Sequence, residues 1–425
     1  MRASFYESDI TPPLGGYLYG NYCEQIADGV AEKLYAKALV VEDGGNIAAM
    51  VAIDSCTIPA DLHDIVTKRI YDYTGIAPEC VSISSTHTHK GIPIHDSPDI
   101  NCFADDTYTD VCYRLIADAV ILAYKRLGDE EVEVSYGTGE VKDVAHNRNG
   151  EVADGTYRTH VRMRDDLVRP IGEVDESLNI ITFSKNGKKI GAVVNFSCHL
   201  DCTGGKKMEY SGDYAAVLSG ILKEKYGSDF VSLFVTGACG NVNHHPSDKN
   251  VPVKTYIRIG QEIAEEALKV IENSKPVAGG VSVCKELIEI ERRKPDEATV
   301  DKINNKGTDK PMREMLLMNY MYYKHTNKET HSKLYVQSIR IGDVALAVLP
   351  GEIYASTGLA IKAKSPFAKT IVVENSNSSC GYVPTRDLFG DNCLLYESML
   401  CYGSCLVPEA SDIIESKALE LLKKI

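Results

Sequence analysis

The sequence predicts an α/β fold, with a mixed β-sheet core covered by helices, in a single large domain. Apolar, β-prone runs alternate along the chain with amphipathic stretches of helical spacing. Glycine-containing turn signals separate several of the strand runs in pairs, as hairpins require. No Pro/Ser-rich linker divides the 425 residues, and no internal repeat is visible. We therefore expect one domain over residues 1–425.

The first third of the chain predicts a hairpin, two helices and a buried strand. Strands are expected at 36–41 and 47–53, helices at 62–73 and 108–127, and the buried strand at 80–84. The turn Asp43-Gly44-Gly45 separates the first two strands. The buried strand leads directly into Thr86-His87-Thr88-His89.

The middle third repeats this alternation. Strands at 178–183 and 190–196 flank Asn186-Gly187, and a further buried strand is expected at 230–235. One helix is expected at 256–273, and another runs to residue 225 with Asp213 as its N-cap.

The last third contains the least regular segment, 292–332, which is charged and then rich in Met and Tyr. Because Met serves both in cores and at adaptable surfaces, this segment is either a helix packed on the core or a lid over a pocket. Strands at 334–341 and 344–349 follow, then a helix after Pro350-Gly351-Glu352 and a final helix at 409–424.

Composition and charge limit the partners. The net charge is −14, from 60 acidic and 46 basic residues, which argues against nucleic acid and against anionic membranes. No run reaches the ~18 apolar residues that span a bilayer, and Glu7 and Asp9 interrupt any signal peptide. Thirteen scattered cysteines do not suggest a disulfide framework. We expect a cytoplasmic protein that acts on a small molecule, and the sequence does not predict its oligomeric state.

The residues that could bind a metal or take part in catalysis follow directly after predicted strands. His87 and His89 follow the strand at 80–84, His199 follows 190–196, and Glu352 follows 344–349. Such strand ends collect sites in α/β sheets. In an extended chain His87 and His89 would face the same side. Two histidines and one glutamate form a frequent catalytic zinc set, with one position open for water.

Two alternatives use cysteine. Cys198 and Cys202, on either side of His199, could supply thiolates to a structural zinc, although the chain has no second cysteine pair of this kind. Cys239, in Gly237-Ala238-Cys239-Gly240, could be a nucleophile served by a histidine. A buried cysteine is more often a small core residue.

Several longer motifs occur in a specific order: VSISSTHTHKG, NFSCHLD, FVTGACGNVN, LPGEIYASTG and GYVPTRD. In these motifs and their order the chain resembles the catalytic domain of the neutral (non-lysosomal) ceramidase family, including its short bacterial relatives. The resemblance implies a zinc hydrolase domain over 1–425, without the family's C-terminal β-sandwich domain. It also implies roles for seven residues: metal ligation by His87, His199, Glu352 and Tyr382, and substrate contacts by His89, Arg148 and Tyr396.

The expected reaction is hydrolysis of an N-acyl amine or a related small amide by a Zn²⁺-activated water. Arg148 would anchor a polar or anionic substrate group, and His89 would pass a proton to the leaving amine. Departures from the family occur at Lys90-Gly91-Ile92-Pro93 and at 240–244, in loops that line the pocket. With no Trp and few Phe, the chain has little to meet a membrane lipid, so ceramide itself is not the expected substrate. An esterase or lactonase, or a zinc-binding module without catalysis, remains as an alternative.

Overall fold

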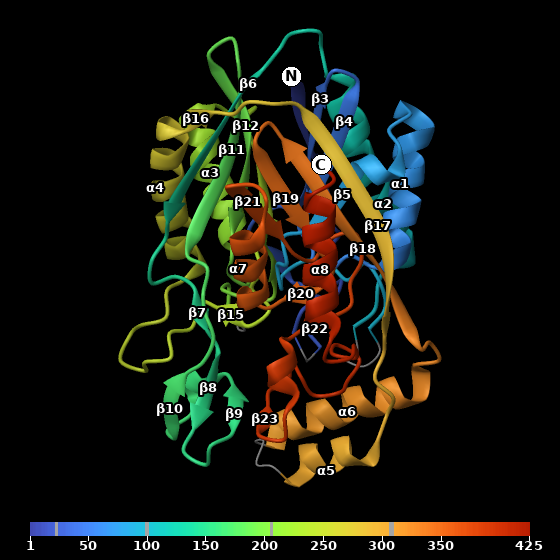
Figure 1. The fold of residues 1–425 in the computed structure, drawn as a ribbon, viewed down its shortest axis with the longest axis vertical. Helices are drawn as coiled ribbons and strands as arrows, with labels where there is room; N and C mark the ends of the chain where they lie inside the picture. Colours follow the sequence, from blue (N-terminus) through green and yellow to red (C-terminus); the bar gives the residue numbers. More distant parts are fainter. Residues whose placement is uncertain (22–23, 98–101, 205–206, 306–309) are drawn as a thin grey trace.

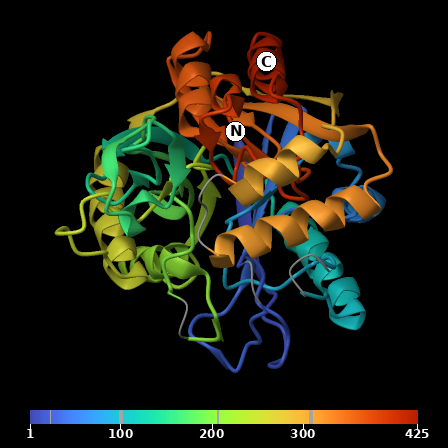
Figure 2. The ribbon, with the colours of Figure 1, turned by 90° about the horizontal axis from the view of Figure 1, so that it is seen from below.

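Three sheets surround a common apolar core, and helices cover their outer faces in the computed structural model (Figure 1). The structure describes residues 1–21, 24–97, 102–204, 207–305 and 310–425. This arrangement confirms the predicted α/β class with mixed sheets. Seen from below, the first, middle and last parts of the chain occupy three sectors around the centre (Figure 2).

The three sheets share one topology. In each, three strands pair antiparallel in succession, and a helix then leads to a fourth strand that pairs parallel with the third. The first unit consists of β1 (Arg2–Asp9), β3 (Tyr35–Asp43), β4 (Asn46–Ile53), α1 (Ala60–Thr74) and β5 (Val81–Ser85). The second consists of β6 (Glu133–Glu140), β11 (Ser177–Lys185), β12 (Lys188–Phe196), α3 (Asp213–Tyr226) and β14 (Val231–Thr236). The third consists of β17 (Val281–Glu291), β18 (His331–Ile341), β19 (Val344–Val348), α7 (Ala355–Lys364) and β21 (Lys369–Val373).

A second helix follows each unit: α2 (Asp106–Lys125), α4 (Tyr256–Asn273) and α8 (Ala410–Leu422). The fold therefore contains a repeat that is not visible in the sequence. The units share their order of strands rather than their residues. Apolar strands and turns of different sequence can form the same strand order.

The inner faces of the three sheets meet in one core. Leu39 of β3, Ile181 of β11 and Leu346 of β19 are fully buried there. A separate apolar layer lies between each sheet and its own pair of helices. The central strands of these sheets are thus covered on both faces, which explains why most of them read as continuous apolar runs, whereas β6 and β17 are partly exposed along their length.

Smaller elements gather at one end of the molecule, at the bottom of Figure 1. A four-stranded sheet contains β10 (Leu167–Pro170), β8 (Asn149–Val152), β9 (Tyr157–Thr159) and β23 (Cys393–Leu394). The helices there are α5 (Glu297–Asn305) and α6 (Lys310–Thr326).

Three short strand pairs complete the β-structure: β7 (His146–Asn147) with β15 (Val242–Asn243), β20 (Glu352–Ile353) with β22 (Tyr382–Val383), and β2 (Gly29–Val30) with β13 (Glu209–Tyr210). Strand β16 (Lys275–Pro276) extends the second sheet.

The predicted hairpins and helices are present, with ends shifted by a few residues. Strands β1, β6, β17 and β21 were not expected. Asp213 is not the N-cap of α3: Gly212 takes that place, and the buried Asp213 carboxylate accepts from the backbone of Cys202 and Thr203. Among the described residues, no helix has both the length and the apolar character to cross a bilayer.

The shared core predicts a large cost for a truncation at its centre. Leu346→Ala should lower the free energy of unfolding by about 2–5 kcal/mol. The truncated side chain would leave a cavity, and the three packed sheets cannot move inward to fill it. Leu287→Ala, on β17 with its side chain 50% exposed, is the control and should change it by less than about 0.5 kcal/mol. Urea denaturation followed by circular dichroism measures both. Equal losses would contradict a common core.

Candidate metal centre

Each of the three units contributes one potential metal ligand just beyond a strand end. His87 lies two residues after β5, His199 three residues after β12, and Glu352 four residues after β19. Their ligand atoms all lie within 4.8 Å of one another. The Oε2 atom of Glu352 is 3.5 Å from Nε2 of His87 and 3.3 Å from Nε2 of His199. The structure therefore brings together the three residues that the sequence places at strand ends.

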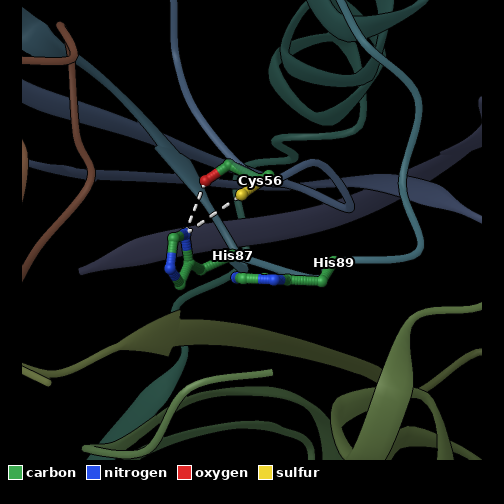
Figure 3. Close-up of side chains that lie close together, drawn as sticks. All are labelled: Cys56, His87 and His89. Carbon is green, nitrogen blue, oxygen red and sulfur yellow. Dashed lines mark hydrogen bonds between the residues drawn. The ribbon is translucent and has the colours of Figure 1, made fainter. Parts of the chain in front are cut away.

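The other ring nitrogen of each histidine is held by a backbone carbonyl. Nδ1 of His87 donates to the Cys56 oxygen over 2.7 Å (Figure 3), and Nδ1 of His199 donates to the Cys239 oxygen over 2.9 Å. A carbonyl only accepts, so the proton resides on Nδ1 and the lone pair on Nε2. This second set of contacts fixes both rings with Nε2 directed at Glu352.

Two of the three ligand atoms lack ordinary partners, whereas Nε2 of His199 lies 3.4 Å from Nη1 of Arg148. His87 Nε2 and Glu352 Oε2 are buried, and within the described part of the chain neither has a hydrogen bond. Burial alone would raise the pKa of Glu352, but His87 and His199 lower it below its usual range, which keeps the carboxylate ionised. Two imidazoles and one ionised carboxylate suit a divalent transition metal and leave a position open for water. The residues fit a bound metal.

His89 lies beside this centre, although not for the expected reason. His87 has a φ of +66°, so the segment is not extended there. The ring centroids of His87 and His89 lie 5.0 Å apart, and the two ring planes meet at 89°. The segment is instead fixed by a bridge between Thr88 and Leu200 and by the His89 amide, which donates to the Leu200 oxygen. Burial lowers the pKa of His89 to about 3, and its Nε2 has no partner among the described residues.

Cys56, His87 and His89 form a second group that could hold a metal. In this group the nitrogen of His87 that is nearest to the Cys56 sulfur, at 3.6 Å, is Nδ1. That nitrogen already donates to the Cys56 oxygen (Figure 3). We therefore favour the His87, His199 and Glu352 set.

Two tyrosines and an arginine complete the predicted site. Tyr382 pairs with Glu352 in the β20–β22 ladder, and its hydroxyl is 3.5 Å from that of Tyr396. The guanidinium of Arg148 lies over both rings, at 5.5 and 5.2 Å from their centroids. Arg148 Nε donates to Glu397 over 3.0 Å, and Nη2 donates to the Gly240 oxygen over 2.8 Å. Glu397 therefore balances the charge of the buried Arg148.

Sequence reasoning missed a buried glutamate that supports the ligands. Glu374 accepts from the backbone of Cys239 and of Ile353, at 3.1 and 2.8 Å, and so ties the carbonyl behind His199 to the residue after Glu352. Its burial raises its pKa to about 8. The signal was present, because Glu374 follows β21 directly, as the other candidates follow their strands.

The cysteine alternatives find little support. The Cys239 thiol is fully buried and donates to Glu374 over 3.0 Å, and burial together with that carboxylate raises its pKa, which disfavours a nucleophilic thiolate. Among the described residues, Cys198 belongs to no group able to hold a metal, whereas Cys202 groups with Asp201 and His244.

A cavity of about 590 Å³ opens on the candidate centre. His87, His89, Glu352 and Tyr382 line it. Helix α6 also lines it, through residues that include Asn319 and Tyr322. The centre thus has room beside it for a substrate of small to moderate size.

Comparisons with known proteins identify the family of the chain and a likeness of fold. A family model described as neutral/alkaline non-lysosomal ceramidase, N-terminal, matches residues 6–246, a range that includes His87, Arg148 and His199. The solved neutral ceramidase from Pseudomonas aeruginosa matches with a TM-score of 0.75 and 18% identity, over 100% of this chain and 75% of that chain. A ceramidase complexed with C2 matches with a TM-score of 0.72 and 17% identity, over 99% and 74%. Both likenesses concern the fold. A search of curated protein sequences finds no significant match.

The buried pair of Arg148 and Glu397 generates a stability prediction. Glu397→Ala should lower the free energy of unfolding by about 3–5 kcal/mol, because it leaves the Arg148 charge buried without its counter-ion. Glu151→Ala is the matched control, since Glu151 pairs at 2.7 Å with the exposed Arg169 on the neighbouring strand, and it should cost less than about 1 kcal/mol. Chemical denaturation of the three proteins measures the difference. Equal costs would show that Arg148 does not depend on Glu397.

Proposed function

The chain belongs to the neutral/alkaline non-lysosomal ceramidase family, and from this premise we propose a zinc-dependent hydrolase that cleaves an amide bond. The substrate class is an N-acyl amine or a related small amide. The observation that carries the proposal is the convergence of His87 Nε2, His199 Nε2 and Glu352 Oε2, buried together at the ends of three strands. The cavity beside them favours catalysis over metal binding alone.

His87, His199 and Glu352 would hold the metal, with Tyr382 beside Glu352 as a fourth ligand or a close neighbour. A zinc ion bound there supplies Lewis acidity that activates water at neutral pH and polarises the carbonyl. The carbonyl oxygens of Cys56 and Cys239 keep both imidazoles in the required tautomer. Gly240 permits its loop to approach the backbone of Glu352 closely, because a Cβ there would lie 2.5 Å from the backbone carbonyl oxygen of Glu352.

The remaining residues act on the substrate. Burial raises the pKa of Tyr396, so its hydroxyl stays protonated and can donate to the oxygen on which negative charge develops. His89, with Nε2 free of protein partners among the described residues, is placed to hydrogen-bond the leaving amine. The expected anchoring role of Arg148 stays untested. Because Glu397 already balances its charge, we assign Arg148 to positioning the two tyrosine rings.

We further propose a cytoplasmic location and a small, water-soluble substrate. Every cysteine in the described part of the chain is a free thiol, as a reducing compartment favours. The acidic net charge disfavours nucleic acid and anionic membranes as partners. With no Trp and few Phe to meet a lipid surface, the chain offers little support for ceramide itself as substrate.

The proposal predicts close to one zinc per chain and hydrolysis of simple N-acyl amines. Elemental analysis measures the metal, and amine release measures turnover on a panel of acyl amines and matching esters. Glu352→Ala and His87→Ala should lose both zinc and turnover, because each removes a ligand. His89→Ala should keep its zinc and lose turnover.

Two results would contradict this prediction. If His87→Ala retains its full zinc content, His87 is not a ligand. If His89→Ala empties the site as completely as Glu352→Ala does, both histidines are ligands and their division of roles is wrong. Preference for the esters would place the activity with esterases or lactonases instead.

Cys239→Ala should leave kcat/KM within about tenfold of the wild type, or about 1.4 kcal/mol in barrier. The backbone carbonyl that holds His199 is kept in this variant, and the nucleophile is a water rather than the thiol. Steady-state kinetics on a zinc-loaded sample measure the effect. Complete loss of turnover in a folded, zinc-containing Cys239→Ala protein would instead indicate cysteine catalysis.

A further inference from the structure

A second cavity, of about 680 Å³, adjoins the candidate centre through Arg148 and Tyr396, which line it. Its other walls come from the β8–β9 region, the short helix at Val161–Met163 and the loop after β15. His160 lines it as well and stacks on Tyr396 at a centroid distance of 5.6 Å. Leu316 of α6 reaches this cavity, whereas Asn319 and Tyr322 of the same helix line the first one. Helix α6 therefore borders both cavities.

The charged residues around the second cavity are not balanced. Four arginines and two aspartates line it: Arg148, Arg158, Arg162, Arg164, Asp165 and Asp166. Glu397 balances Arg148, and Asp166 accepts two hydrogen bonds from Arg164, at 2.8 and 2.7 Å. Asp165 pairs with Lys249 outside the cavity. Arg158 pairs with Asp154 at 3.5 Å, so Arg162 provides the excess positive charge.

Arg162 is held by neutral groups alone among the described residues. Its guanidinium donates to the backbone oxygens of Pro246, Asp248, Lys249 and Val251. Four carbonyls satisfy the donors but contribute no negative charge. The loop after β15 is therefore wrapped around a cation at the edge of the cavity.

Arg158 provides a donor in the wall. The residue is only 5% exposed, and its Nε donates to Thr156 over 2.9 Å. Its Nη2 is 3.5 Å from the carboxylate of Asp154, which is itself largely exposed. Its Nη1 is buried and has no hydrogen-bond partner in the described part of the chain. A buried guanidinium donor without an acceptor is costly, so its retention points to an external acceptor.

Two histidines of the second cavity are neutral, mainly because they are buried. Burial and then the charge of Arg148 lower the pKa of His160 to about 4. Burial, His244 and Arg162 contribute to a pKa of about 4 for His245, against the opposing effect of Asp201. Both rings are therefore neutral at pH 7, and they can donate hydrogen bonds without adding charge.

We propose that this cavity, the arginine pocket, binds a carboxylate of the substrate while the scissile amide lies at the metal centre. The proposal rests on the proposed amidase function and names its substrate class: an amide with an anionic group on one side. Arginine suits this task because its planar fork matches a carboxylate. Val161, Leu316 and Leu394 provide apolar walls for a short stem between the two groups.

The carboxylate could lie on either side of the amide, and two matched substrate pairs distinguish the sides. N-hexanoylglycine and N-hexanoylglycinamide test the amine side. N-butylglutaramate and N-butylglutaramide, followed by butylamine release, test the acyl side. The zinc-loaded wild type should have a kcat/KM about 10- to 100-fold higher for the anionic member of one pair, the range of a charge-assisted hydrogen bond. The pair with the preference locates the carboxylate.

Arg158→Met should reduce that preference to less than about threefold, because it removes the charge and the free donor but keeps a stem of similar length. Arg158→Lys should keep part of it. Arg169→Met is the control, since Arg169 belongs to β10 in the same small sheet, is 59% exposed and does not line the cavity. It should leave the preference unchanged. Because the readout is a ratio within one preparation, partial loss of folded protein does not distort it.

Glutarate binding, measured by calorimetry on the wild type and Arg158→Met, tests the pocket without turnover. Binding that is lost in the variant supports the arginine pocket even if no amide is hydrolysed, in which case the proposed function alone fails. Equal turnover of both members of each pair, with glutarate binding equal in the two proteins, would overturn the arginine pocket and leave the amidase proposal standing.

Discussion

The close approach of His87 Nε2, His199 Nε2 and Glu352 Oε2 is the constraint on which the rest of the structure depends. Three buried polar atoms within 4.8 Å have lost their water and gained few hydrogen bonds in return. Such an arrangement costs several kcal/mol unless a bound ion or the surrounding fold compensates. His87 also occupies the left-handed region at φ +66°, which adds local strain. The apolar core and the layers beneath the helices must therefore stabilise a centre that is itself unfavourable.

The threefold topology explains how this convergence is achieved. In each unit the third and fourth strands run parallel, so their carboxyl ends lie side by side, and one end supplies the ligand while the other supports it. Cys56, after β4, holds His87, which follows β5. Cys239, after β14, holds His199, which follows β12. Glu374, after β21, accepts from Ile353, next to Glu352. In the first unit the ligand follows the fourth strand and the support follows the third. In the other two units the ligand follows the third strand and the support follows the fourth.

The sequence could predict the parts of this design that are local. Apolar runs and glycine turns located most strands, and a reactive residue at a strand end identified His87, His199 and Glu352. The supporting contacts could not be predicted, because each joins positions far apart in the chain. Arg148 and Glu397 are 249 residues apart, and either alone resembles an ordinary surface charge. The threefold order of strands was equally hidden, since topology does not require similar residues. The extended-chain argument for His87 and His89 was wrong because the strand ends at Ser85 and the backbone turns at His87.

Helix α6 shows how both interpretations of the segment 292–332 hold in part. Leu316, Tyr320 and Tyr323 are buried against the third unit, as in a core helix. The hydroxyls of Tyr320 and Tyr323 donate over 2.6 Å to the backbone oxygens of Asp296 and Arg293, which fasten the helix to the chain that precedes it. Other α6 residues line the cavity at the metal centre, as in a lid. Because a helix anchored by buried tyrosines cannot swing away without exposing them, α6 acts as a fixed wall of both cavities. Selection among substrates then depends on the shape and charge of the cavity walls, and Arg162, which has no carboxylate partner among the described residues, lines only the second cavity.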